Sequence, residues 1–256
     1  MKTYAIANQK GGVGKTTTSV NLAAALAAMK RRVLLVDLDA QGNATMGVGI
    51  DKHAIEKGIC EVLTGECTAA EACLVTPTPN LSVLPANDTL TAAEVHLKQV
   101  EQASGVLGSA LSHLRNDFDV VLFDCPPSLS MLTVNALAAA DGVLIPMQCE
   151  YYALEGLSSL VRTIGQIRQS VNPRLQIAGI LRTMYDPRSN LSRQVSLELG
   201  KHFDSSLLRT VVPRNVRLAE APSHGEPVLS YDTRSTGAKA YIALAGELTR
   251  REAKSR

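Results

Sequence analysis

The sequence predicts an α/β fold, a doubly wound and mostly parallel β-sheet with helices on both faces. Short runs rich in Val, Ile and Leu alternate along the chain with longer stretches of helical period. The short runs are apolar throughout, which is typical of parallel strands that are buried on both faces. Because strand and helix alternate, the expected arrangement is a doubly wound sheet. A chain of 256 residues can bury a substantial core, and we expect residues 1–256 to form a single domain.

The individual elements follow from these runs in order. The predicted strands are residues 3–8, 33–39, 81–86, 119–124, 142–148, 175–184 and 207–213. The longest helical stretches are residues 16–29, 91–114 and 154–171. The last helix has Tyr241, Leu244 and Leu248 on one face, and we expect this face to pack in the core.

Composition narrows the class of protein. Hydrophobic residues make up 45% of the chain and charged residues 20%, and no apolar run reaches the roughly 18 residues of a membrane span. The first strand begins too early to leave room for a secretory signal. The five cysteines form an odd set without a CxxC pair, which argues against a disulfide framework or a zinc site. We therefore expect a cytoplasmic protein that does not bind membranes.

Charge is distributed unevenly along the chain. Residues 1–128 contain 10 Lys and Arg against 13 Asp and Glu, whereas residues 129–256 contain 16 against 11. Residues 182–217 alone contain seven basic side chains and three acidic ones. The second half is thus net positive and suggests a polyanionic partner, although a basic face that contacts only water is the alternative.

Residues 8–18, with the sequence NQKGGVGKTTT, form a candidate phosphate loop. The common pattern G-x-x-x-x-G-K-[ST] would place its first glycine where this chain has Gln9, so a strict search would miss the loop. Glycines in the loop still allow backbone N–H groups to surround an anion, and the loop leads from a strand into the N-terminus of a helix. Lys15 is then expected to reach the β- and γ-phosphates, and the Thr16 hydroxyl to bind Mg²⁺. The alternative is a glycine-rich turn without a ligand.

Two predicted strands end in acidic residues at the edge where ligands bind in such sheets. Asp124 ends one strand and is expected to hold Mg²⁺ through water. Asp39 opens the loop after another strand and is the candidate to position a water against the γ-phosphate. For Asp37, one residue inside that strand, a structural role and a supporting role at the site both remain open.

Five segments occur in the order of a known family: KGGVGKTT, DLDAQGN, DCPPS, QCEYYALEGL and PRNVRLAEAPSHG. Together they resemble the ParA/Soj family of chromosome- and plasmid-partitioning ATPases, relatives of MinD with a deviant Walker A loop of the P-loop NTPase type. The resemblance implies ATP and Mg²⁺ as cofactors. It assigns nucleotide contacts to Lys10, Gly11, Gly12, Val13, Gly14, Lys15, Thr16, Thr17, Pro213 and Asn215, the last two at the adenine.

The same resemblance implies roles in catalysis and assembly. Lys10, the second lysine of the loop, would reach the partner subunit's phosphates in an ATP-dependent homodimer, with Lys15 and Asp39 as the other catalytic residues. Thr16, Asp39 and Asp124 form the implied metal set. Family members bind double-stranded DNA without sequence preference, and a ParB/Spo0J-like centromere-binding protein stimulates hydrolysis. The implied location is therefore at the nucleoid.

The positions that correspond to the family's DNA contacts are Arg188 and Arg217. The sequence shows no helix-turn-helix segment before the loop, so site-specific DNA reading is expected to come from the partner. Three other functions are weighed beside this one. A MinD-like membrane ATPase would need an apolar C-terminal anchor. An electron donor resembling the nitrogenase iron protein would need a companion for Cys125. A nucleotide-gated scaffold without hydrolysis stays open.

Overall fold

The computed structural model of the protein describes residues 1–254, and a β-sheet of eight strands runs through it. The strands are β1 (Lys2–Ile6), β2 (Val33–Asp37), β3 (Leu74–Val75), β4 (Leu81–Leu84), β5 (Val120–Asp124), β6 (Gly142–Gln148), β7 (Gln176–Tyr185) and β8 (Leu207–Pro213). Their order across the sheet is β3-β4-β2-β5-β1-β6-β7-β8. All neighbours are parallel except β3 and β4, so the predicted doubly wound, mostly parallel sheet is confirmed.

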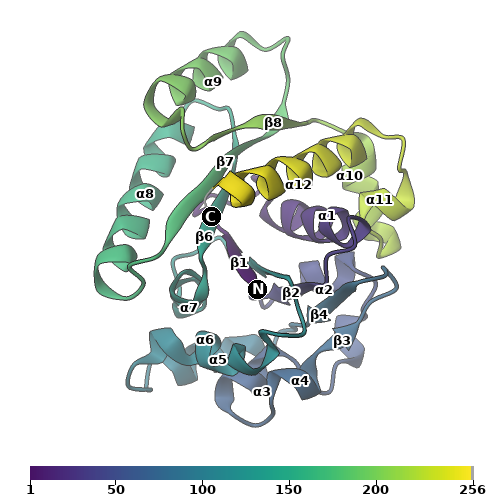
Figure 1. Ribbon diagram of the computed structural model, residues 1–256, viewed down its shortest axis with the longest axis vertical. Helices are drawn as coiled ribbons and strands as arrows, with labels where there is room; N and C mark the ends of the chain where they lie inside the picture. Colours follow the sequence, from purple (N-terminus) through teal and green to yellow (C-terminus); the bar gives the residue numbers. More distant parts are fainter. Residues whose placement is uncertain (255–256) are drawn as a thin grey trace.

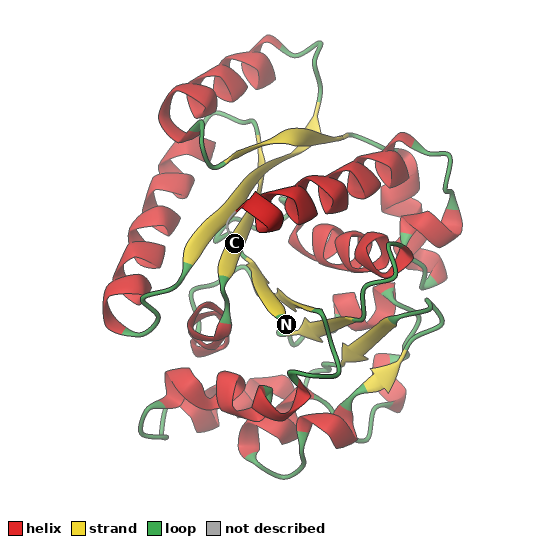
Figure 2. Ribbon diagram, viewed as in Figure 1, coloured by secondary structure: helices red, strands yellow, loops and turns green. Residues whose placement is uncertain are grey.

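Helices connect the strands and form two layers. The α-helices are α1 (Lys15–Ala28), α2 (Asn43–Gly47), α3 (Ile59–Thr64), α4 (Ala69–Ala72), α5 (Leu90–Leu97), α6 (Val106–Ala110), α7 (Met131–Ala139), α8 (Ala153–Ser170), α9 (Asn190–Phe203), α10 (Val216–Glu220), α11 (Val228–Tyr231) and α12 (Thr236–Lys254). Short 3-10 turns are η1 (Lys52–Ala54), η2 (Ala103–Gly105), η3 (Ser112–Leu114) and η4 (Ala221–His224). One face of the sheet packs against α1, α2 and α10–α12 and the other against α3–α9 (Figure 1). Figure 2 shows the strands enclosed between these two layers.

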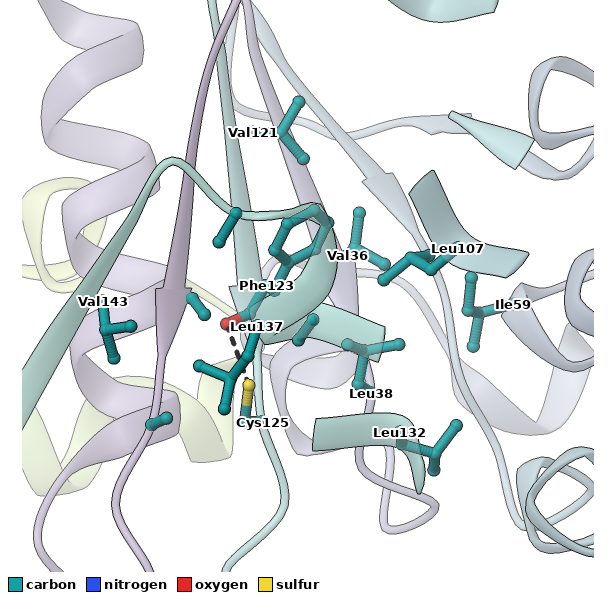
Figure 3. Packing of buried hydrophobic residues seen from close by; sticks show 14 of the residues in the cluster. Val36, Leu38, Ile59, Leu107, Val121, Phe123, Cys125, Leu132, Leu137 and Val143 are labelled. Atoms are coloured by element: carbon teal, nitrogen blue, oxygen red, sulfur yellow. Dashed lines mark hydrogen bonds between the residues drawn. The ribbon is translucent and has the colours of Figure 1, made fainter. Parts of the chain in front are cut away.

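The central strands are buried on both faces because neighbouring side chains point to opposite layers. Val36 and Phe123 face the layer of α3–α9, whereas Leu35 faces the layer of α1 and α12. Phe123, Val36 and Leu137 belong to the same apolar cluster, and the Cys125 thiol lies 3.8 Å from the Phe123 carbonyl oxygen (Figure 3). This two-sided burial is the reason that the strands read as unbroken apolar runs.

The strand register places the carboxyl ends of β1, β2 and β5 side by side. Asp124 pairs with Ile6 of β1 on one side and with Asp37 of β2 on the other. The chain leaves all three strands at the carboxyl edge of the sheet, where ligands bind in open α/β folds. The predicted loop and both acidic strand ends therefore meet at the same edge.

Helix α1, which follows the predicted phosphate loop, is buried along most of its length and packs on α12. The Thr18 and Tyr241 hydroxyls lie 3.2 Å apart, and the backbone N–H of Val228 donates to Asn21 Oδ1 at 2.7 Å. Leu244 and Leu248 of α12 are buried beside Tyr241, which confirms the core face predicted for the last helix. No helix in residues 1–254 is both long and apolar enough to cross a membrane.

One predicted element was wrong. Residues 91–114 do not form one helix, because α5 ends at Leu97 and the chain then continues through η2, α6 and η3. Gln102 adopts a left-handed conformation (φ 57°) that a helix interior does not accept. The Leu107 N–H donates to Asn135 Oδ1 of α7 at 3.1 Å, so a side chain contributed by another helix satisfies the first turn of α6.

Candidate nucleotide-binding site

The loop between β1 and α1 has the form of an anion cradle. Gly12 and Gly14 adopt positive φ angles of 72° and 84°, which side chains with a Cβ rarely accept. A Cβ built at Gly11 or Gly12 would meet no atom within 4 Å, so space is open beside the loop backbone. Helix α1 begins at Lys15 without a side-chain cap and without an acidic residue in its first turn. Its N-terminus is therefore free to bind a negative charge.

Lys15 lies inside this loop. It is buried, and its Nζ donates a hydrogen bond to the Lys10 carbonyl oxygen at 2.9 Å. Burial lowers the pKa of Lys15, while the negative charges of Asp124 and Asp39 act in the opposite direction. The ammonium thus stands in a partly dehydrated position where a phosphate would interact with it strongly.

Lys10 points away from the loop interior. Its Nζ lies 2.5 Å from Glu150 Oε2, and both side chains remain nearly half exposed. The Lys10 backbone N–H donates to Asn8 Oδ1 at 2.9 Å, and Asn8 Nδ2 donates to the Pro146 carbonyl oxygen at 2.8 Å. The two lysines therefore occupy different environments: one is enclosed by its own loop and one faces outward.

Asp124 has the features of a magnesium ligand. Its Oδ1 accepts a hydrogen bond from Ser19 Oγ at 2.7 Å, whereas its Oδ2 is buried without a hydrogen-bond partner among the described residues. Burial and, second, the charge of Asp37 raise the pKa of Asp124 to about 7, and side-chain hydrogen bonds with Ser19 and Thr16 act against this rise. An unsatisfied buried carboxylate oxygen beside a threonine hydroxyl suits a hard cation such as Mg²⁺.

Asp37 and Asp39 differ in burial and in their hydrogen bonds. Asp37 is fully buried and accepts three hydrogen bonds, from the Asp39 N–H and from the N–H and hydroxyl of Thr45. Burial raises its pKa to about 6. It therefore fixes the loop after β2 that carries Asp39, which is a structural contact and also supports the candidate site. Asp39 is half-buried, and its Oδ1 accepts a hydrogen bond from the Gln41 N–H at 3.0 Å.

A cavity of about 150 Å³ lies next to the loop and is lined by Gly14, Thr17, Met184, Pro213 and Asn215, among other residues. The predicted nucleotide contacts Pro213 and Asn215 are thus brought to the phosphate loop from the far end of the sheet. Asn215 caps α10 by accepting from the Leu218 N–H at 3.3 Å. Pro213, Met184 and the methylene groups of the wall offer an apolar surface on which a flat base could lie.

Arg188 and Arg217 lie beyond the carboxyl ends of β7 and β8, at the same edge of the sheet. Arg188 is highly exposed and forms an ion pair with Asp186 at 3.0 Å. Arg217 forms ion pairs with Glu220 at 2.8 Å and Asp232 at 3.4 Å. Each arginine is therefore paired with acids of its own chain, and no ion pair or hydrogen bond among residues 1–254 joins either one to the phosphate loop.

Sequence reasoning missed several contributors to the site. Ser19 could have been found, because it stands four residues after Lys15 and such residues share a helix face. Thr45, Glu150 and Thr183 gave no such signal. Thr183 Oγ1 donates to the Val13 carbonyl oxygen at 2.7 Å, a contact across 170 residues that depends on the finished sheet.

These features define a class. A glycine-rich loop that holds a buried lysine at a helix N-terminus, beside an acid at the end of the neighbouring strand, is the site of a P-loop nucleotide-binding ATPase. The family model described as "AAA domain" matches residues 1–177. The sporulation initiation inhibitor protein Soj of Bacillus subtilis is 50% identical over 96% of this chain and 98% of its own. The chromosome partitioning protein ParA of Caulobacter vibrioides is 49% identical over 98% of this chain and 95% of its own. The chain belongs to the ParA/Soj family of chromosome-partitioning ATPases.

A solved structure gives the same fold. The protein called cobyrinic acid a,c-diamide synthase from Mycobacterium smegmatis, crystallised with an ATP analogue and magnesium, superposes with a TM-score of 0.88. It is 39% identical, and the match covers 100% of this chain and 97% of that one. The recognition made from the five sequence motifs is thereby confirmed at the level of family and fold.

Proposed function

We propose that residues 1–256 act as one ATPase domain that partitions DNA through an ATP-dependent dimer. In this cycle, binding of ATP and Mg²⁺ drives two copies together and the dimer binds double-stranded DNA without sequence preference. Hydrolysis, stimulated by a ParB-like partner, then releases the DNA. The observation that carries the proposal is the contrast between the two lysines: Lys15 is enclosed by its loop, whereas Lys10 faces outward from it.

Each residue of the loop has a separate task in this proposal. Lys15 and the backbone N–H groups from Gly11 to Thr17 hold the phosphates of the same chain. Thr16, Asp39 and Asp124 would hold Mg²⁺, Asp124 through a water molecule, and the bound ion would offset negative charge on the phosphate oxygens. Asp39 extends from a loop that Asp37 fixes, and it orients the attacking water. Pro213 and Asn215 contribute to the adenine pocket.

In this proposal, Lys10 is the residue that makes dimerisation depend on ATP. Two phosphate-bearing faces repel each other, and a cation contributed by each copy offsets this repulsion. Because the attraction exists only when phosphates are present, dimerisation becomes linked to nucleotide binding. Lys10 is exposed enough to leave Glu150, since a solvent-exposed ion pair contributes at most about 1 kcal/mol.

Arg188 and Arg217 are proposed to bind DNA phosphates. Each is already paired with acids of its own chain, so DNA has to compete with weak, solvent-exposed ion pairs. The net positive charge of residues 129–256 favours this exchange. Binding of this kind reads no sequence, which is consistent with a protein that is held at the nucleoid in the cytoplasm and receives site specificity from its partner.

Two other functions can be compared with this one. A MinD-like membrane ATPase is disfavoured because Tyr241, Leu244 and Leu248, the apolar face of α12, pack against α1. The name of the Mycobacterium protein offers amide synthesis as a second candidate. Identity to the partitioning relatives is higher, at about 50% against 39%, and partitioning is therefore our conclusion.

A DNA-binding titration with ATP, with ADP and without nucleotide tests the proposal. Duplex DNA of unrelated sequences should bind far more tightly with ATP and Mg²⁺ than in the other two conditions, because a dimer doubles the contact surface. Phosphate release should rise when DNA and the ParB-like partner are added. Equal DNA affinity in all three conditions would contradict the proposed cycle and would favour a different role for the ATPase.

A further inference from the structure

Two adjacent tyrosines directly before α8 are exposed to solvent. Tyr151 and Tyr152 are 75% and 71% exposed, and their rings pack edge to face with centroids 5.0 Å apart. The other tyrosines of the described chain are buried or half-buried. An aromatic side chain removes roughly 150–250 Å² from water when it is covered, so this pair is a large apolar surface without a partner in its own chain.

The pair is attached to the phosphate loop at two points. Gln148 Nε2 contacts the Gly12 carbonyl oxygen at 3.4 Å, and Glu150 Oε2 accepts from Lys10 Nζ at 2.5 Å. These two residues closely precede the tyrosines, which follow the carboxyl end of β6. The exposed rings therefore lie on the same edge of the sheet as the loop, next to the lysine that faces outward.

The charges beside the tyrosines suit a second copy of the same chain. Lys10 and Glu150 stand together on this face and both are nearly half exposed. In a two-fold symmetric contact the same patch meets itself, and the Lys10–Glu150 pair leaves this patch without net charge in the free monomer. A face with charges of one sign would repel its own copy, whereas the paired charges of this face do not.

We propose that Tyr151 and Tyr152 are the apolar anchor through which two copies of this chain meet over their phosphate loops. The inference rests on the ATP-dependent dimer of the proposed function and names the surface that stabilises it. A stable interface buries about 800 Å² on each partner, and tyrosines near its centre commonly dominate the binding energy. Exposed ion pairs alone contribute little.

The first experiment compares dimerisation of three variants in sedimentation velocity with a non-hydrolysable ATP analogue and Mg²⁺. Tyr151→Ser combined with Tyr152→Ser should weaken dimerisation at least about tenfold, because apolar contact is lost at the centre of the interface. The Phe double variant keeps both rings and should dimerise like the parent. Val75→Ser is the matched control, because Val75 is 83% exposed on edge strand β3, away from the loop. Affinity of the monomers for the analogue, measured at a protein concentration too low for dimerisation, should stay within about twofold throughout.

The second experiment uses the parent protein and needs no folded variant. Nitration with tetranitromethane, read by peptide mass spectrometry, should modify Tyr151 and Tyr152 first because they are the exposed tyrosines of the described chain. The analogue with Mg²⁺ should protect both residues, and protection should increase with protein concentration. Coverage by the nucleotide itself would give protection that is independent of protein concentration, and that result would overturn the inference.

The outcomes separate this inference from the proposed function. If the parent dimerises with the analogue and the Ser double variant dimerises equally well, the tyrosines are not the anchor, while the proposed function stands. If that variant dimerises normally but no longer responds to a ParB-like partner, the pair docks the partner and the inference is wrong. If the parent stays monomeric with the analogue, both the proposed dimer and its anchor are refuted.

Discussion

Replacing Asp124 by Asn is expected to stabilise the nucleotide-free protein at alkaline pH and much less at acidic pH. Burial and the charge of Asp37 raise the pKa of Asp124 from 3.8 to about 7 in the folded chain. Between these two values the folded state retains a proton that the unfolded state has lost, so stability falls as pH rises and the loss is complete above about pH 7. An asparagine side chain at this position would carry no charge and would avoid this loss, while its oxygen could still accept from Ser19.

The size of the effect follows from the pKa shift. The difference between 3.8 and about 7 corresponds to at most about 4 kcal/mol in the free energy of unfolding at about pH 8, and to about 1 kcal/mol at about pH 4.5. The unpaired amide of the asparagine offsets part of this gain equally at both pH values. Urea unfolding followed by circular dichroism in EDTA would measure this difference, with equal m-values as the check on two-state behaviour. If the stability of the variant relative to the parent did not increase between about pH 4.5 and about pH 8, Asp124 would not be a destabilising buried charge.

Asp119 provides a control of opposite sign on the same segment. Its pKa is lowered to about 2, first by the side-chain hydrogen bond with Arg32, so its stabilising effect is present at neutral pH and is lost as pH falls through the folded pKa. Asp119→Asn should therefore destabilise the protein at about pH 8. Adding ATP and Mg²⁺ should stabilise the parent more than Asp124→Asn, because Asp124 is proposed to hold the metal.

Four other predictions concern the proposed cycle. Lys15→Ala should abolish binding of a fluorescent ATP analogue, because it removes the cation that faces the β- and γ-phosphates; normal affinity would mean that the loop has another function. Lys10→Ala should leave the ATP affinity of the monomer, measured at a protein concentration too low for dimerisation, within about twofold and should prevent the ATP-dependent dimer in sedimentation, so an unchanged dimer fraction would refute its cross-subunit role. Asp39→Ala should slow phosphate release at least about tenfold and prolong the time on DNA, because a residue that orients the water acts on the chemical step. Unaffected release would shift that role to another residue. Arg188→Ala and Arg217→Ala should each lower the slope of log affinity against log salt by about one unit per lost phosphate contact. If the double variant of Arg188 and Arg217 still dimerised and bound duplex DNA like the parent, the two arginines would be ordinary solvent-exposed residues and not DNA contacts.

The fold was predictable where the sequence signal is local. Buried parallel strands are continuous apolar runs, so the positions of β1, β2 and β5 could be located within about two residues. The failure at residues 91–114 has a tertiary cause, since Asn135 of α7 satisfies the first turn of α6 and allows the helix to break before it. Strand β3, with only two residues, pairs antiparallel at the edge and has no pattern long enough to detect.

The candidate site, like the fold, was predictable only where the sequence signal is local. The loop and the two acids stand directly after strands, so their meeting follows from the parallel sheet. The contacts that tie the site together do not follow from any local pattern. Glu150 reaches Lys10 across 140 residues and Thr183 reaches Val13 across 170, so both depend on where the strands lie in the sheet. The hydrogen bonds by which Asp37 holds the loop after β2 could not be predicted from the sequence either, because its partner Thr45 lies beyond a turn.

The packing of α1 against α12 has a consequence for the order in which the protein is made. The helix that presents the phosphate loop is covered by the last helix of the chain, through Thr18 and Tyr241 among other contacts. Residues 15–28 leave the ribosome early, yet their apolar cover is synthesised only after residue 236. Contacts of such long sequence separation form late in folding. A nascent chain would therefore present no finished nucleotide site to ATP before α12 has been synthesised and has packed on α1.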